Sequence, residues 1–293
     1  MLDHRFPILI MTRNEDEYLE TCISSILLKT SIPIKIYIID NNSTSKKQIS
    51  YLNSLSDNGN IEIVKNKNNL WILGLNKTIK EIKNKHTSKY FVLSDGDIDV
   101  SICSAAPCWL SYLISKMDSN ISLGKIGISL DWSFIKKKPE LNNILKQEMS
   151  LYDEAKKIDD LYVSCVDTTL AIYRWDWSIN KNSSFYPDHI RYLRPELYSC
   201  RTNKNIVVKH LGWESYLINI VDKNSINSKV LCFALVGGDV KNQILLKSDL
   251  SYRIFYKIFS QSIKKTWLLK RLYHLLFYMM RKGWRNLDGY GTF

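Results

Sequence analysis

Two aspartates separated by one glycine, Asp95 and Asp97, follow the apolar run from Tyr90 to Leu93. Gly96 between them lets the backbone approach a ligand closely. Carboxylate oxygens are hard ligands that suit Mg²⁺ or Mn²⁺, and both ions keep positions for water and phosphate oxygens. A cation held by the pair would stabilise the charge on a departing diphosphate. The pair therefore predicts a metal site. A capped turn or solvated loop is the alternative for such a motif taken alone.

Three side chains further along the chain have types suited to acid–base chemistry or metal binding. Asp167 is a candidate general base that takes the proton of an acceptor hydroxyl, or a carboxylate hydrogen-bonded to the neighbouring threonines. Glu214 is the competing base, although the helix dipole also favours an acidic residue near a helix start. His210 either completes the metal shell, or contacts a diphosphate as a neutral imidazole, or is a buried histidine without a ligand.

Apolar runs separated by helical patterns predict the elements that position these residues. Four buried strands are predicted at residues 7–12, 34–39, 61–64 and 90–93. Helices are predicted between them: one with Asn14 as its N-cap and an end near Lys29, one that contains Ile49, Leu52 and Leu55, and one over residues 73–84. Such alternation of strand and helix predicts a parallel sheet with right-handed crossovers, so the fold class is α/β.

Polar clusters follow three of these strands, at residues 12–15, 40–44 and 95–99. In a parallel sheet, ligands bind beyond the carboxyl ends of the strands, so the three clusters are predicted to converge on one crevice. Beyond residue 99 the pattern is less regular, with a helix predicted over 105–116, a strand over 125–130 and a strand-like run over 162–173. We expect this half to shape the acceptor site.

The composition indicates a folded protein: of 293 residues, 45% are hydrophobic and 24% are charged. Its six cysteines are scattered without close spacings, which favours reduced thiols in a cytosolic protein. The first residues contain too short an apolar stretch for a signal peptide, and no segment approaches the roughly 20 apolar residues that span a bilayer. We therefore expect a cytoplasmic protein.

The formal net charge of +12 is concentrated near the carboxyl end. Residues 251–285 hold nine of the 41 basic residues and no acidic one, which leaves 32 basic against 29 acidic residues elsewhere. Apolar side chains recur there at helical spacing: Phe255, Phe259, Ile263, Trp267, Leu268, Leu272, Leu275 and Met279. This pattern predicts either a helix on the anionic inner face of the cytoplasmic membrane, or a helix packed on the domain with its basic residues facing water.

Four segments in the first hundred residues resemble, in the expected order, the GT-A glycosyltransferases of the broad family-2 type. They are P-I-L-I-M-T-R-N-E from residue 7, I-I-D-N-N-S-T from residue 38, N-N-L-W-I-L-G-L-N over 68–76, and Y-F-V-L-S-D-G-D-I-D-V from residue 90. One departure is the bulky Leu70, Trp71 and Ile72, where family members often carry extra glycines. A weaker resemblance, to bacterial surface-polysaccharide glycosyltransferases, lies in V-D-T-T-L-A-I-Y (166–173) and K-H-L-G-W (209–213).

The resemblance implies a GT-A (Rossmann-like), mostly parallel sheet flanked by helices, with a helical C-terminal tail. By the same resemblance, Asp95 and Asp97 bind Mn²⁺ or Mg²⁺, and Asp40 lies near the base or ribose of the donor. The implied nucleotide-sugar-binding residues are Thr12, Arg13, Glu15, Asp40, Asn76 and Asp95. We expect three regions: a nucleotide-sugar-binding half (1–100), a metal and acceptor half of the same domain (101–245), and a basic amphipathic tail (250–293).

The predicted function is metal-dependent transfer of a sugar from a nucleotide-diphosphate-sugar, with UDP-sugar favoured, to a glycan or glycolipid. The acceptor would belong to bacterial surface polysaccharide biosynthesis, such as lipopolysaccharide or capsule. The sequence leaves inversion and retention open, and retention would need no general base.

Two other classes of protein are alternatives. A sugar-nucleotidyltransferase needs a glycine-rich loop after the first strand, and residues 11–15 contain no glycine. A nucleic-acid-binding protein would spread positive charge over a groove, whereas here the charge is confined to one apolar tail. We therefore expect no nucleic-acid partner.

Overall fold

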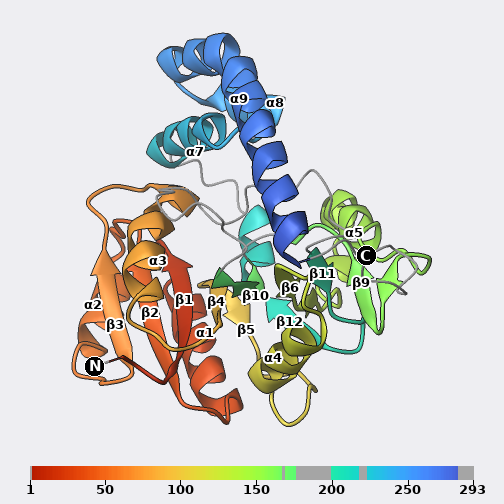
Figure 1. Cartoon of the computed structure of the whole chain (residues 1–293). Helices are drawn as coiled ribbons and strands as arrows, with labels where there is room; N and C mark the ends of the chain where they lie inside the picture. The colour runs from red at the N-terminus through yellow and green to blue at the C-terminus, as the bar shows by residue number, and fades with distance from the viewer. Residues whose placement is uncertain (1, 167–168, 176–198, 218–222, 283–293) are drawn as a thin grey trace.

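The computed structural model describes residues 2–166, 169–175, 199–217 and 223–282 (Figure 1). Within them, a nine-stranded sheet has the order β3-β2-β1-β4-β10-β6-β11-β9-β8. Its first four strands pair in parallel: β3 (Ile61–Lys65), β2 (Ile34–Asp40), β1 (Phe6–Thr12) and β4 (Tyr90–Asp95). The predicted parallel α/β sheet is therefore confirmed.

Beyond β4 the sheet becomes mixed. β10 (Leu170–Arg174) runs antiparallel to both β4 and β6 (Lys125–Gly127), and β6 pairs in parallel with β11 (Ser199–Arg201). The far edge consists of β9 (Leu161–Val163) and β8 (Lys157–Ile158). Because β10 lies between two strands that precede it in the chain, both halves of the sequence contribute to one continuous sheet.

A second, three-stranded sheet has the order β5-β12-β7, formed by β5 (Ile98–Asp99), β12 (Val207–His210) and β7 (Ser129–Leu130). The run predicted as one strand over 125–130 is therefore divided between β6 and β7, which belong to different sheets. β12 runs antiparallel to β5, with His210 opposite Ile98. This pairing brings the segment that follows Asp97 beside the segment that ends in His210.

The helices of the first half and the middle of the chain are α1 (Glu17–Lys29), α2 (Lys46–Ser54), α3 (Asn76–Lys83), α4 (Trp109–Ser119) and α5 (Asn142–Met149). Short 3₁₀ helices occur at Trp71–Leu75, Ile135–Lys137, Pro139–Leu141 and Leu211–Leu217. The predicted helix over 73–84 therefore consists of a 3₁₀ helix followed by α3.

Two predicted helix starts were wrong. Asn14 does not cap α1, because its side-chain oxygen accepts hydrogen bonds from the backbone N–H groups of Thr44 and Ser45 at 2.7 and 3.0 Å. α4 begins four residues later than predicted, at Trp109, where the sulfur of Cys108 accepts a hydrogen bond from a backbone N–H of the first turn. In both cases the polar contact depends on tertiary or local geometry that periodicity does not reveal.

Alternation along the strands fills an apolar layer on each face of the sheet. In β1, Ile8 and Ile10 belong to one cluster, which also contains Leu19 of α1. Leu9 points to the other cluster, which contains Ile82 of α3. Both faces of the parallel strands are therefore buried, as continuous apolar strands require.

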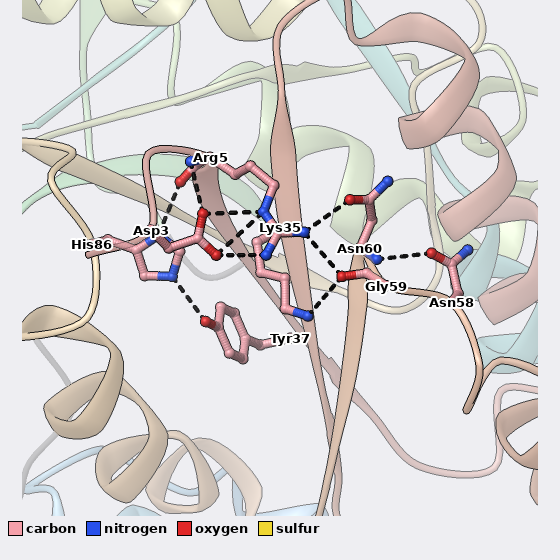
Figure 2. A network of polar contacts seen from close by, with 8 residues as sticks. All are labelled: Asp3, Arg5, Lys35, Tyr37, Asn58, Gly59, Asn60 and His86. Atoms are coloured by element: carbon pink, nitrogen blue, oxygen red, sulfur yellow. Dashed lines mark hydrogen bonds and ion pairs between the residues drawn. The ribbon is translucent and has the colours of Figure 1, made fainter. Parts of the chain in front are cut away.

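A polar network fixes the start of the chain at the amino ends of these strands (Figure 2). Arg5 donates to both carboxylate oxygens of Asp3 and lowers the pKa of Asp3 to about 2. The Arg5 guanidinium also donates to Asn60 Oδ1 at 2.9 Å. His86 Nδ1 lies 2.9 Å from the carbonyl oxygen of Arg5, and its Nε2 lies 2.8 Å from the hydroxyl of Tyr37. This network lies at the edge opposite to the predicted crevice.

The last described part of the chain is helical: α7 (Lys223–Leu235), α8 (Asn242–Lys247) and α9 (Leu250–Lys282). α9 is the long blue helix of Figure 1, and α7 packs along it. Near its end, Leu275 and Tyr278 join the apolar cluster that contains Leu9. None of the helices in the described ranges has the length and apolar character needed to cross a membrane.

Candidate active site

The loop after β1 is fixed by a buried glutamine from α2. The side-chain oxygen of Gln48 accepts from the backbone N–H groups of Glu15 and Asp16 at 2.6 and 3.1 Å. Its nitrogen donates to Thr12 Oγ1 at 3.0 Å and to Ser43 Oγ at 2.7 Å. One side chain therefore joins the loops after β1 and β2, which are two of the three polar clusters predicted to converge.

The third cluster lies beside them because β1 is the neighbour of both β2 and β4. In the strand register Thr12 lies opposite Asp40, and the residue before Thr12 lies opposite Asp95. A Cβ atom at Gly96 would overlap the carboxylate of Glu15. Glycine at this position therefore allows the loop after β1 to pack closely on the Asp-Gly-Asp turn.

β12 brings His210 beside the same turn. His210 Nδ1 lies 3.7 Å from Asp97 Oδ2, and both side chains are 14% exposed. The backbone N–H of Leu211 donates to the carbonyl oxygen of Asp97 at 2.8 Å. A Cβ atom at Gly212 would overlap the Asp97 carboxylate, so glycine at this position allows the segment after β12 to approach the turn closely. The ring of His210 stacks on Trp213, with the two centroids 5.2 Å apart.

Negative charge is concentrated at this edge of the sheet. Burial raises the pKa of Glu15 well above its ordinary value, and the negative charge of Asp97 raises it further. The hydrogen bond from Thr12 Oγ1 to Glu15, 2.7 Å long, opposes this rise, while Asp95 and Asp40 add to it. Carboxylates that lie close together in a partly enclosed space create a negative potential that attracts a cation.

The side chains at this edge fit an open Mg²⁺ or Mn²⁺ site rather than a closed one. Across the described ranges, no three His, Cys, Asp or Glu side chains are grouped closely enough to hold a metal by themselves. Asp95 and Asp97, with the imidazole of His210 nearby, offer two hard carboxylates and one nitrogen. Mg²⁺ is commonly bound through one or two carboxylates, with water and substrate phosphates as its other ligands. The donor set therefore suits a metal that binds together with a phosphate-bearing ligand.

A cavity of about 290 Å³ opens at this edge, which is near the lower end of the volumes of ligand pockets. It is lined by the segment after β1 (residues 11–15 and Tyr18), by residues after β2 and β3 (Asn41, Asn69 and Trp71), and by Asp97, Gly212, Ser215 and Ser225. Side chains from both halves of the chain therefore surround one volume that includes an aspartate of the Asp-Gly-Asp turn.

Trp71 forms part of the cavity lining in a strained backbone conformation. Its φ of 51° lies in the left-handed region, which costs a bulky residue roughly 1–2 kcal/mol. Its carbonyl oxygen accepts from Asn41 Nδ2 at 3.1 Å, and its ring nitrogen donates to Ser228 of α7 at 3.0 Å. The ammonium group of Lys229 lies 5.0 Å from the centre of its ring. Strain that is held by contacts from two elements is typical of functional positions.

The sequence matches the family model described as glycosyl transferase family 2 over residues 8–179. The chain belongs to glycosyl transferase family 2. Its α/β sheet is the GT-A type that the resemblance implied, and the protein is a glycosyltransferase. Of the three classes of function that the sequence suggested, this is the one shown.

Solved structures similar to this glycosyltransferase share little sequence with it. The mannosyltransferase PcManGT from Pyrobaculum calidifontis, in complex with GDP-Man and Mn²⁺, is 13% identical, with 97% of this chain and 77% of that chain covered and a TM-score of 0.49. TarS 1–349 from S. aureus is 13% identical, with 94% and 73% covered and a TM-score of 0.46. Glucosyl-3-phosphoglycerate synthase from Mycobacterium tuberculosis, with Mn²⁺, UDP and phosphoglyceric acid, is 11% identical, with 81% and 80% covered and a TM-score of 0.46. No curated protein matches the sequence significantly.

The predicted donor residues of the glycosyltransferase lie in different positions relative to the cavity. Thr12, Arg13 and Glu15 line it directly. Asp40 is buried at the end of β2, where its Oδ1 accepts two hydrogen bonds from Ser43. Asn76 begins α3 and is not part of the lining, and neither is Asp95.

Of the two candidate general bases, the structure describes only Glu214. Glu214 is exposed, and the hydroxyl of Tyr18 donates to its Oε2 at 3.0 Å. Burial raises the pKa of Tyr18, and this hydrogen bond raises it further. Because Tyr18 lines the cavity, Glu214 is one side chain away from it. Asp167 lies outside the described residues.

Sequence reasoning missed Gln48 and Tyr18. Gln48 belongs to no motif. The one feature of the sequence that indicates its burial is its position four residues before Leu52, which places both side chains on the buried face of α2. Tyr18 lies in the first turn of α1 and has no pattern that separates it from an ordinary helix residue. Both roles arise from contacts between segments far apart in the chain.

Proposed function

We propose that this glycosyltransferase moves a sugar from a nucleotide-diphosphate-sugar to a hydroxyl group of a glycan or glycolipid, with Mn²⁺ or Mg²⁺ bound at Asp95 and Asp97. One observation carries the proposal: the carboxylates of Glu15 and Asp97 meet at a cavity beyond the carboxyl ends of the parallel strands. Ligands of open α/β sheets bind at such edges.

Asp95 and Asp97 would hold the metal, with His210 beside them as a further ligand or as a contact to the diphosphate. The metal supplies positive charge for the departing nucleoside diphosphate. Asp95 ends β4, and the pairing of β12 with β5 places His210 beside Asp97. The absence of side chains at Gly96 and Gly212 leaves room for the carboxylates of Glu15 and Asp97, respectively.

The donor would lie along the cavity with its diphosphate near Asp97 and Arg13 and its base near Asn41 and Trp71. An indole ring beside the base provides a surface for stacking. Thr12 and Glu15, held by Gln48, complete the nucleoside side, with Asp40 behind them. UDP-sugars, which the sequence reading favours, are the first donors to test.

Glu214 and Asp167 are the proposed general bases for an inverting reaction. The hydrogen bond from the Tyr18 hydroxyl to Glu214 Oε2 supports Glu214 as a base, because it orients this carboxylate beside the cavity. Asp167 remains a proposal on its residue type and position in the sequence alone. A retaining reaction would need neither residue as a base.

We also propose that the three regions expected from the sequence have three different roles. Residues 1–100 would bind the donor, residues 101–245 would complete the metal site and shape the acceptor site, and residues 250–293 would attach the enzyme to an anionic membrane surface. The resemblance at 166–173 and 209–213 favours bacterial surface polysaccharide, such as lipopolysaccharide or capsule, as the acceptor. The proposed location is the inner face of the cytoplasmic membrane.

Thermal unfolding with a panel of nucleotide-sugars, in the presence and absence of Mn²⁺, tests this function. A ligand at about a hundredfold excess over its Kd stabilises by about 2.7 kcal/mol, which raises the Tm by several degrees. We expect this rise for one donor class with Mn²⁺ and its loss in Asp97→Ala. The exposed Asp57→Ala is the matched control and should behave like the wild type. Mn²⁺-independent stabilisation that survives in Asp97→Ala would contradict the proposed metal site.

A further inference from the structure

α9 presents two different apolar faces. One faces the protein: Trp267, Leu275 and Tyr278 are buried, and the ring nitrogen of Trp267 donates to the carbonyl oxygen of Leu235 in α7 at 2.7 Å. The hydroxyl of Tyr278 donates to the carbonyl oxygen of Ser122 at 2.7 Å. These contacts fix the helix to the catalytic domain and determine which of its side chains remain outside.

The opposite side of α9 is also apolar, and it is exposed. Its large side chains have exposed fractions from 48% at Ile254 to 82% at Met280. Their spacing of three, four or eleven residues keeps them on one side of the helix. We call this set the outer face: Ile254, Ile258, Leu269, Leu272, Leu276 and Met280.

The outer face does not coincide with the stripe that the sequence suggested. Trp267 and Leu275 of that stripe are buried against the protein, whereas Leu269, Leu276 and Met280 were not part of it. The sequence of α9 is apolar on more than one side, and the packing of the helix on the protein decides which apolar side is exposed to solvent. Since isolated exposed leucines are common, the informative observation is the unbroken row of Leu269, Leu272, Leu276 and Met280 at spacings of three and four residues.

Positive charge accompanies the outer face, and negative charge is absent from the helix sequence. Lys257 and Lys265 are exposed, and no carboxylate within the described ranges forms an ion pair with either. Residues 251–285 contain nine basic residues and no acidic one. Lys264 pairs with Asp239 and so belongs to the protein side. An apolar row with unneutralised lysines near it is complementary to lipid chains below anionic head groups.

We propose that the outer face of α9 inserts into the interface of an anionic bilayer, with Lys257 and Lys265 at the level of the lipid phosphates. This inference rests on the membrane partner of the proposed function and names the side chains that make the contact. Because the inner face of α9 is packed on α7 and on the sheet, insertion would hold the catalytic domain at the surface. Acceptors anchored in the same leaflet would then reach the cavity at a raised local concentration.

Co-sedimentation of the full chain with phosphatidylcholine vesicles, with and without a quarter of phosphatidylglycerol, tests the proposal. We expect binding to the anionic vesicles, at least a tenfold loss in the double variant Leu269→Gln/Leu276→Gln, and weaker binding at higher salt. Leu28→Gln is the matched control, because Leu28 of α1 is 80% exposed and distant in sequence from α9. A double substitution Lys257→Gln/Lys265→Gln should reduce the preference for anionic lipid.

Three outcomes would overturn the proposal: no binding by the wild-type chain, wild-type binding by the leucine double variant, or equal loss in Leu28→Gln. A second copy of the chain is the competing occupant of the outer face. It would appear as a dimer in sedimentation that the leucine double variant abolishes while vesicle binding is unchanged. Donor-dependent thermal stabilisation, measured on the same variants, should remain as in the wild type, so a failure here is distinguishable from failure of the proposed donor site.

Discussion

At the residue scale, the candidate site consists of carboxylates that the fold holds close together. Glu15 accepts a hydrogen bond from Thr12 and faces the Asp-Gly-Asp turn, so its proton is held more tightly in the folded chain than in the unfolded chain. A group whose pKa is raised by folding contributes its full stabilisation below its ordinary pKa, which is 4.5 for glutamate. This contribution to the free energy of unfolding decreases as the pH rises above that value.

We predict that Glu15→Gln gains stability relative to the wild type between pH 5 and pH 8 when no divalent cation is present. The difference in free energy of unfolding should widen by at most about 1.4 kcal/mol per pH unit, and urea unfolding at the two pH values measures it. Glu17→Gln is the control, because the pKa of the exposed Glu17 is lowered and its charge is constant over this range. A difference that does not change with pH would show that Glu15 carries no raised pKa.

Trp71 is the residue whose side chain best distinguishes a base-binding role from a structural one. We predict that Trp71→Ala weakens UDP binding by roughly tenfold or more, since stacking on a base contributes about 1–3 kcal/mol. Binding of inorganic pyrophosphate, which has no base, should change less than twofold. Isothermal titration in Mn²⁺ measures both, and Trp71→Phe should recover part of the UDP affinity. An equal loss for both ligands would mean that Trp71 only supports the shape of the cavity.

At the scale of elements, a single side chain of one helix is hydrogen-bonded to two loops. Gln48 of α2 satisfies two backbone N–H groups of the loop after β1, and it donates to that loop and to the loop after β2. The relative position of these loops therefore depends on a residue that does not line the cavity.

We predict that Gln48→Leu lowers the free energy of unfolding by about 2–4 kcal/mol, because the buried N–H groups of Glu15 and Asp16 lose their acceptor. Urea denaturation measures this loss, and the donor affinity should fall in parallel because the loop is released. Gln147→Leu on α5 is the control, since Gln147 is exposed. Unchanged donor affinity in a destabilised Gln48→Leu variant would show that donor binding does not depend on how Gln48 holds the loop.

At the scale of the whole molecule, α9 is part of the core as well as a surface. Leu275 belongs to the apolar cluster that contains Leu9 of β1, whereas its neighbour Leu276 is half exposed on the outer face. Deleting α9 to test membrane binding would therefore uncover part of the sheet, so single substitutions are the better experiment.

We predict that Leu275→Ala costs about 2–5 kcal/mol of stability, as truncation of a buried leucine usually does. Leu276→Ala should change stability by less than about 0.5 kcal/mol, because surface substitutions rarely do more. Chemical denaturation of the two variants provides the comparison between adjacent positions. Equal effects would contradict the orientation of α9 on which the outer face depends.

The sequence by itself determined the first half of the protein. Continuous apolar runs such as Ile8 to Ile10 specify strands buried on both faces, and the polar clusters after the strands predict the edge at which the cavity opens. These signals are local, since each needs only neighbouring residues and a fixed period. The turn with Asp95 and Asp97 could be found in this way because its position after a strand is written in the chain.

The tertiary structure alone decided the rest, because the remaining contacts join segments that no period connects. His210 reaches Asp97 only through the pairing of β12 with β5, and Gln48 reaches Thr12 only because α2 folds back over the loop after β1. The exposed side of α9 could not be read from its sequence, since both sides are apolar. Which of them meets solvent is settled by the free energy of packing Trp267 and Tyr278 against distant parts of the chain.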